Sequence, residues 1–62
     1  MTLEEQIWED LVSRKQFCSA KQISRKLMVS ISYVRTVLIM YHKRGILDKV
    51  VRDKTNFYRV KP

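Results

Sequence analysis

Residues 30–45, SISYVRTVLIMYHKRG, place five apolar residues in a row between polar and basic ends. Such a run suits a buried strand, part of a membrane anchor or a helix. Val34, Val37, Leu38 and Tyr41 recur at i, i+3, i+4 and i+7, the spacing of one helix face. The run is apolar at both odd and even positions, so it fails the alternation of a strand. It also falls well short of the roughly 18 apolar residues of a membrane span. The pattern therefore predicts a helix.

The ends of this helix carry the expected stop and start residues. Ser30 is a preferred N-cap residue, and Gly45 stands where a glycine ends a helix. Lys43 and Arg44 come just before it, where cations complement the negative end of the helix dipole. We therefore expect this helix over about residues 31–44.

Another helix is predicted near the N-terminus, over about residues 3–14. Thr2 with Glu5 three residues later forms a capping box, and apolar residues then recur at four-residue spacing. The expected core stripe consists of Leu3, Ile7 and Leu11, widened by Trp8 and Val12. The expected solvent side consists of Glu4, Glu5, Glu9 and Asp10.

A short helix is predicted between these two, over about residues 20–27. Ser19 and Gln22 form a second capping box, and Ile23 and Leu27 are its expected buried residues. The preceding residues KQFC, at 15–18, break the helical period and are expected to be extended.

The pattern changes to that of strands after Gly45. Leu47 and Val51 share parity, as do Tyr58 and Val60, and DKTN between them supplies turn residues. A hairpin is predicted over about residues 46–60, with strands at 46–52 and 56–60. The expected fold is a single domain over residues 1–62 that is mainly α with a small β-hairpin, in the α+β class.

The charge of the chain is positive and uneven. Thirteen Lys and Arg against six Asp and Glu give a net charge of +7. Residues 1–16 hold four acids and two bases, net −2, whereas residues 17–62 hold eleven bases and two acids, net +9. The basic part predicts a polyanionic partner such as nucleic acid.

Catalytic and metal-binding patterns are missing from the sequence. Cys18 is the one cysteine and His42 the one histidine, which excludes an internal disulfide and a four-ligand Cys/His zinc site. There is no glycine-rich phosphate loop and no nucleophile–base pattern. We expect a non-enzyme without cofactor or metal, a buried unreactive Cys18 and a solvated His42. The acidic N-terminus is unlike a signal peptide, which favours a cytoplasmic protein without membrane attachment.

Residues 20–38 carry the pattern of a helix-turn-helix, two helices joined by about three residues with the second one longer. Small Ser24 stands where the two helices approach each other. Counted from Ala20, the buried positions of the motif hold Ile23, Leu27, Val29, Val34, Val37 and Leu38.

With these positions the chain resembles the winged helix-turn-helix family. VSISYVRTVLIMYHKRGIL, at 29–47, is similar to the recognition-helix region of that fold, and FYRV, at 57–60, to its closing wing strand. Many such motifs have glycine at the start of the turn, where this chain has Met28. A positive φ at Met28 would cost about 1–2 kcal/mol.

The resemblance implies double-stranded DNA as the partner, with the helix at 31–44 in the major groove and the hairpin as a wing on the backbone or minor groove. Arg35 is the first choice for reading a base, through paired hydrogen bonds to guanine. The candidate DNA contacts are Lys21, Arg25, Ser30, Ile31, Ser32, Tyr33, Arg35, Thr36, Arg52 and Lys54. Lys26 is a further candidate phosphate contact, and Lys43 and Arg44 are assigned to the helix dipole instead.

Within that family, the size of the chain, Leu27-x-Val29-Ser30 and the exit KRGIL are most similar to the small regulators of fimbrial operons of the PapI and FaeA type. That likeness implies a bacterial or plasmid-borne transcription regulator that acts with a larger co-regulator, as a monomer or weak homodimer, and is nucleoid-associated when bound to DNA. Two alternatives stay open: a winged-helix adaptor for protein–protein interaction, and a DNA-binding protein of plasmid or phage replication or maintenance. Trp8 either covers the core against the hairpin or, with Ile39 and Met40, forms a partner surface.

Overall fold

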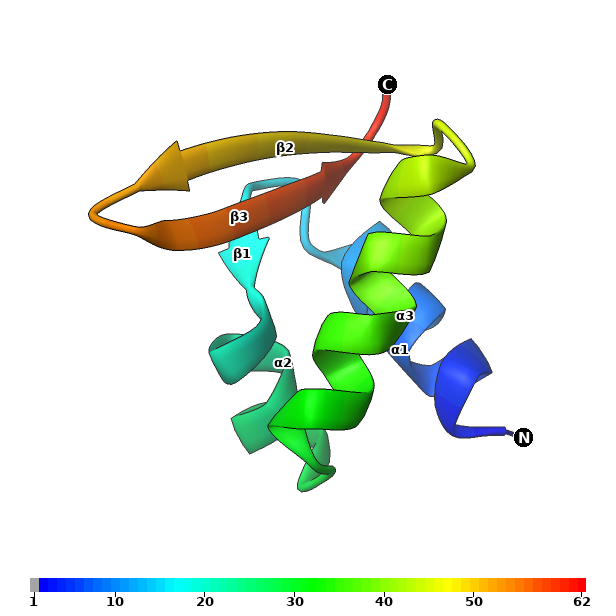
Figure 1. Cartoon of the computed structure of the whole chain (residues 1–62). Coiled ribbons are helices and arrows are strands. Elements are labelled where there is room, and N and C mark those ends of the chain that lie inside the picture. Colours follow the sequence, from blue (N-terminus) through cyan, green and yellow to red (C-terminus); the bar gives the residue numbers. More distant parts are fainter. Residues whose placement is uncertain (1) are drawn as a thin grey trace.

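The computed structural model describes residues 2–62 as three helices and one three-stranded antiparallel sheet (Figure 1). The elements are α1 (Leu3–Ser13), β1 (Cys18–Ser19), α2 (Ala20–Leu27), α3 (Ile31–Lys43), β2 (Leu47–Arg52) and β3 (Thr55–Val60). The predicted α+β class is confirmed. The predicted helix ends at residues 14 and 44 are each one residue too late, because Arg14 and Arg44 are cap residues, Arg14 with an extended backbone.

The sheet has the order β1-β3-β2, so the C-terminal strand lies in its middle. The extended segment expected at 15–18 leads into β1, in which Cys18 and Ser19 pair with Tyr58 and Phe57 of β3. This pairing joins residues about 40 positions apart and had no local signal in the sequence. It brings the start of α2 beside the hairpin (Figure 1).

Both predicted capping boxes are present. The Thr2 hydroxyl accepts from the Glu5 backbone N–H at 3.1 Å, and the Ser19 hydroxyl accepts from that of Gln22 at 3.3 Å. Ser30 occupies the predicted cap position of α3, but its side chain makes no capping hydrogen bond. The prediction of Ser30 as a capping side chain is therefore wrong, and α3 is held instead by its buried face.

The turn between α2 and α3 contains a left-handed residue. Met28 has φ 57° and ψ 44°, and its side chain is 90% exposed. The Val29 N–H donates to the Ser24 carbonyl at 3.1 Å, the bond that closes a left-handed helix end. The Ser24 hydroxyl returns a hydrogen bond to the Val29 carbonyl at 2.6 Å. These two bonds hold the tight turn although Met28 lacks the freedom of glycine.

Met28→Gly is expected to raise the free energy of unfolding by about 0.5–1 kcal/mol. The substitution removes a left-handed penalty of about 1–2 kcal/mol, partly offset by the greater freedom of glycine in the unfolded chain. Urea unfolding of the two proteins measures the difference. Met28→Ala is the matched control, because it removes the same exposed side chain but keeps Cβ and therefore the strain. Equal stabilisation by both variants would refute this account.

The core lies where the three helices meet the inner face of the sheet. Its fully buried side chains are Ile7, Leu11, Cys18, Ile23, Val34, Leu38 and Leu47. Leu3 and Val12, predicted as part of the core stripe of α1, are about half exposed. Those two predictions are wrong because Leu3 is the first residue of α1, at the end of the helix, and Val12 borders a surface hollow.

The hairpin turns through two residues rather than the three left between the predicted strands. Arg52 pairs with Thr55, and Asp53 and Lys54 between them have φ 48° and 64°. Two positive φ angles in succession belong to the tight turn that follows the natural twist of a hairpin. The strands consequently run to a tip that projects beyond α2 (Figure 1). Val51 shares the parity of the buried Leu47, but it is 58% exposed because it lies in this projecting part.

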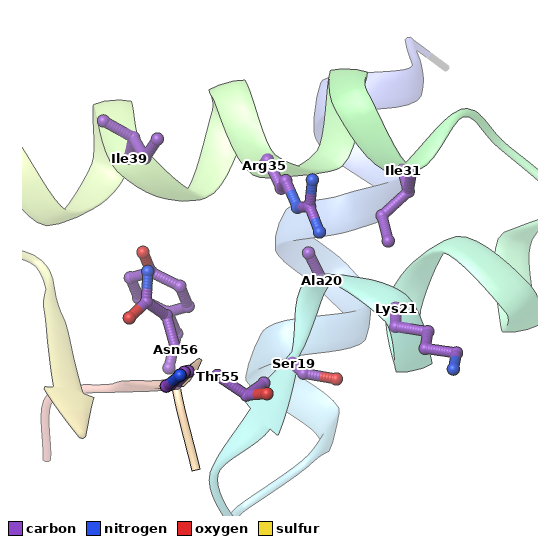
Figure 2. Close-up of a pocket in the computed structure, with 10 residues that line it drawn as sticks. Ser19, Ala20, Lys21, Ile31, Arg35, Ile39, Thr55 and Asn56 are labelled. Atoms are coloured by element: carbon purple, nitrogen blue, oxygen red, sulfur yellow. The ribbon is translucent and has the colours of Figure 1, made fainter. Parts of the chain in front are cut away.

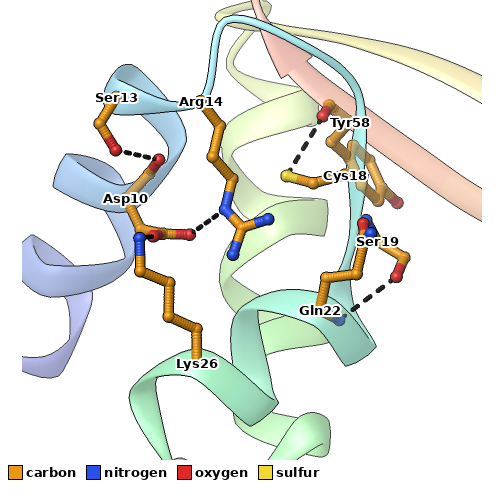
Figure 3. A network of polar contacts seen from close by, with 8 residues as sticks. All are labelled: Asp10, Ser13, Arg14, Cys18, Ser19, Gln22, Lys26 and Tyr58. Atoms are coloured by element: carbon orange, nitrogen blue, oxygen red, sulfur yellow. Dashed lines mark hydrogen bonds and ion pairs between the residues drawn. The ribbon is translucent and has the colours of Figure 1, made fainter.

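Asp10 is buried, which contradicts its predicted place on the solvent side of α1. Its Oδ2 accepts a hydrogen bond from Arg14 Nε at 2.6 Å (Figure 3). Its Oδ1 lies 2.8 Å from Lys26 Nζ, an ion pair without hydrogen-bond alignment. The carboxylate thus joins α1 to α2, and the two cations compensate its burial.

Trp8 packs on α3. Its ring meets that of Tyr41 edge to face, with centroids 5.4 Å apart. Trp8 and Met40 are both partly buried against the core, whereas Ile39 is 48% exposed. Ile39 and Met40 line the same surface hollow, whereas Trp8 lines a different one, so the three residues do not share one hollow.

Across residues 2–62, every helix is too short or too polar to span a bilayer.

Candidate nucleic-acid interface

A groove of about 360 Å³ lies between the first turn of α2, one flank of α3 and the tip of the hairpin (Figure 2). Six of its residues come from the helices and the cap of α2: Ser19, Ala20, Lys21, Ile31, Arg35 and Ile39. The hairpin contributes Lys54, Thr55, Asn56 and Tyr58. We call this surface the basic groove.

Three elements each supply one cation to the basic groove: Lys21 from α2, Arg35 from α3 and Lys54 from the hairpin turn. All three side chains are exposed, and none takes part in the salt bridges found among residues 2–62. No acidic residue is among those that line the groove. The groove therefore presents uncompensated positive charge on a concave surface, which suits an anion of extended shape.

The Arg35 side chain points from α3 toward the first turn of α2 (Figure 2). Ile31, Arg35 and Ile39 follow one another at four-residue spacing and therefore line the same flank of α3. The start of α2 opens onto this flank, and its positive dipole end adds to the charge of Lys21. Arg35 and Lys21 from the predicted set are thus brought together with Ile31.

The other candidates on α3 face different directions. Tyr33 lies two residues before Arg35, about 200° away around the helix, and so on the opposite flank. Ser32 and Thr36 are exposed on the side of α3 that points away from the core. The Thr36 hydroxyl donates to the Ser32 carbonyl at 3.0 Å, so its proton is used inside the helix. Ser30 is exposed just before α3 and lies outside the groove.

The remaining basic candidates also lie in different surroundings. Arg25 is exposed one turn after Lys21 on α2. Lys26 is paired with Asp10 at 2.8 Å and lies outside the basic groove, so it is not brought together with Lys21 and Arg35. Arg52 borders a hollow with Phe17, Val50 and Phe57 on the other face of the hairpin, so it is not brought together with Lys54.

The candidate list left out several residues that line the basic groove, and one cation of the neighbouring hollow on α3. Thr55 and Asn56 line the basic groove beside the turn, and their place depends on the register of the hairpin. Ile39 had a usable signal, since it stands four residues after Arg35 on the same flank. Lys43 follows Ile39 by four residues and borders a hollow with Thr36, so it lies on the exposed side of α3 as well as at the helix end.

Cys18 and His42 stand apart from the basic groove. Cys18 is buried, as predicted, and its Sγ donates to the Tyr58 carbonyl at 3.6 Å (Figure 3). Burial raises the pKa of the Cys18 thiol, which keeps the thiol protonated at neutral pH. His42 is exposed, with its ring 6.2 Å from that of Tyr58.

A second hollow, next to Trp8, has the opposite charge. It is lined by Glu4, Glu5, Trp8, Glu9, Tyr41 and Arg44. The Tyr41 hydroxyl donates to the Glu4 carbonyl at 3.5 Å. Burial and the nearby Glu4 raise the pKa of Tyr41, so the phenol stays neutral here. We call this surface the acidic hollow.

Comparisons of the chain with models of known protein families, with curated proteins and with solved structures found no match.

Proposed function

We propose that this protein is a sequence-specific DNA-binding transcription regulator of the winged helix-turn-helix type. In this proposal α3 is the recognition helix and enters the major groove, which is wide enough for one α-helix. The hairpin of β2 and β3 is the wing and contacts the backbone or the minor groove. The protein then works where DNA is found in a bacterium, in the cytoplasm.

The observation that carries the proposal is the convergence of Lys21, Arg35 and Lys54 on one concave surface. They come from three separate elements, and the groove between them contains no acidic lining residue. A phosphate backbone is the extended polyanion that such a surface fits. Lys21 beside the start of α2 is suited to a phosphate, because free N–H groups and the helix dipole act there together.

The turn chemistry of the hairpin supports a role for its tip. Asn-Gly or Asp-Gly is the preferred pair in a turn with two positive φ angles, and here the pair is Asp53 and Lys54. The lysine therefore keeps a cation at the tip in a strained backbone position. Strain of this kind is typical of functional sites.

The proposed roles differ between residues. Arg35 reads a base, while Lys21 and Lys54 hold phosphates and set the position of the protein on DNA. A chain with a single recognition helix covers about one half-site, so tight binding requires a second copy or a co-bound protein. This agrees with the proposal of a fimbrial-operon regulator that acts with a larger co-regulator.

A salt titration of DNA binding tests the proposal. With two phosphate contacts, from Lys21 and Lys54, log K is expected to fall with log salt at a slope of about −1.8, a loss of about 12-fold between roughly 50 and 200 mM salt. Lys54→Ala is expected to make that slope shallower by about 1 and to weaken all sequences alike. Arg35→Ala is expected to cost about 1–3 kcal/mol and to relax the preference at one base position.

Lys15→Ala is the matched control, because Lys15 is exposed but lines a hollow at the end of α1 instead of the basic groove. It is expected to leave both affinity and slope nearly unchanged. Duplexes from a random library, followed by fluorescence anisotropy, provide the measurement. If no duplex is bound at low salt and Arg35→Ala changes nothing, DNA binding is refuted.

The acidic hollow favours a second candidate function, a winged-helix adaptor that docks another protein. Its carboxylates lie beside the partly exposed Trp8, on the flank of α3 away from Arg35. Three acids there disfavour DNA. If the protein is an adaptor, Glu9→Lys abolishes capture of its protein partner and Arg35→Ala has no effect on that capture. If the protein is the regulator, Arg35→Ala weakens DNA binding and Glu9→Lys does not.

A further inference from the structure

Ile39 is an exposed apolar side chain in the middle of a basic surface. It is 48% exposed and lines the basic groove one helical turn after Arg35. It also borders the neighbouring hollow that contains Thr36 and Lys43. Ile39 therefore lies between two hollows that are both lined by cationic side chains, and about half of the Ile39 side chain stays exposed to water.

The hydroxyl of Thr36, next to Ile39, adds no free hydrogen-bond donor to this part of the surface. The Thr36 hydroxyl donates to the Ser32 carbonyl at 3.0 Å, so its proton is not available to a base edge. Thr36 and Ile39 are three residues apart and adjacent on the helix surface. Together they give this part of α3 an apolar surface between Arg35 and Lys43.

The edges of base pairs in the major groove offer one apolar group, the C5-methyl of thymine. A 5-methylcytosine carries the same methyl at the same position. An isoleucine that contacts it removes apolar surface of both partners from water. Ile39 is four residues from Arg35, about 6 Å along the helix axis, which corresponds to about two base-pair steps.

We propose that Ile39 is a specificity-determining residue that reads a pyrimidine C5-methyl group, within about two base-pair steps of the base contacted by Arg35. This inference rests on the proposed function. The recognition sequence then contains a guanine read by hydrogen bonds and, close to it, a methyl-bearing pyrimidine read by apolar contact.

The test uses a duplex selected from a random library by the wild-type chain at low salt. In one arm each thymine is replaced in turn by deoxyuridine, which lacks the methyl group. In the other arm each cytosine is replaced by 5-methylcytosine. Loss of one methyl contact is expected to weaken binding about fourfold, and a gained contact to strengthen it by a similar factor.

Ile39→Ala is expected to remove this methyl dependence while the salt slope stays that of the wild type. Val12→Ala is the matched control, because Val12 is 49% exposed but lies on α1 outside the basic groove. It is expected to keep the full methyl dependence. Circular dichroism confirms that both variants are folded.

Three outcomes count against the inference and separate it from the proposed function. Duplex binding without any methyl effect overturns the role of Ile39 but leaves DNA binding standing. A methyl effect that persists in Ile39→Ala overturns it too. Failure to bind any duplex from the library overturns both proposals together.

Discussion

Leu38→Ala is expected to leave the protein largely unfolded at 25 °C. Leu38 is fully buried at the centre of α3, where it contacts the core formed by the other helices and the sheet. Truncation of such a leucine costs about 2–5 kcal/mol, from lost burial and the cavity left behind. A chain of 62 residues has a total stability of only about 3–9 kcal/mol, so the loss is of the same size as the whole.

Thermal unfolding followed by circular dichroism checks this expectation. A fall in Tm of at least about 10 °C, or absence of a cooperative transition, is expected. Ile39→Ala is the control one position along the same helix, where the side chain is 48% exposed. It is expected to change stability much less. Similar losses for the two variants would mean that the face of α3 directed to the core has been assigned wrongly.

Asp10→Ala is expected to lower the free energy of unfolding by about 2–3 kcal/mol. The side chain of Asp10 is 3% exposed and accepts from Arg14 Nε at 2.6 Å. Removal of a charged hydrogen-bond acceptor leaves the Arg14 guanidinium, itself only 20% exposed, without its partner. Lys26 is 56% exposed and is solvated by water when the carboxylate is lost, so most of the cost arises at Arg14.

Glu9→Ala provides the control for Asp10→Ala. The two acids are neighbours in α1, but Glu9 is exposed and makes no salt bridge among the described residues. Its replacement is expected to change stability by less than about 0.5 kcal/mol. Urea unfolding of both variants measures the difference. Equal effects would show that the buried ion pairs of Asp10 contribute no more than ordinary surface charge.

Local signals predicted the secondary structure well. Thr2 with Glu5, and Ser19 with Gln22, are three residues apart, so each capping box forms whatever the rest of the chain does. The strained turn at Met28 was also predictable, because the motif requires a left-handed residue there. Such features depend on neighbours within one helical turn, and the sequence contains all of them.

Burial at the edges of elements was predicted less well. Val51 has the parity of a core residue, but the hairpin extends past the helices at that point. Asp10 was predicted to be exposed, because helical periodicity does not show that a cation of another helix will pair with it. In both cases the deciding contact comes from an element distant in sequence.

The candidate interface shows the same division. Arg35, Lys21 and Lys54 could be named from charge and position in the motif, and the structure places them around one groove. Arg52 is only two residues from Lys54, yet it lies on the other face of the hairpin. Lys26 follows Arg25 directly, yet it is used by Asp10. Cations close together in the sequence have different surroundings because the direction of each side chain depends on register and packing.

Three helices, a C-terminal hairpin and a basic surface follow from local sequence patterns, because periodicity, capping residues and charge are local or additive properties. The tertiary structure alone decided that β1 pairs with β3, which carries the start of α2 to the hairpin tip and closes the basic groove. Tertiary packing also sets the surroundings of Ile39, which is one residue of the apolar run 37–41. Four residues of that run face the core or pack against it, and Ile39 remains beside Arg35 in a groove made by three distant segments.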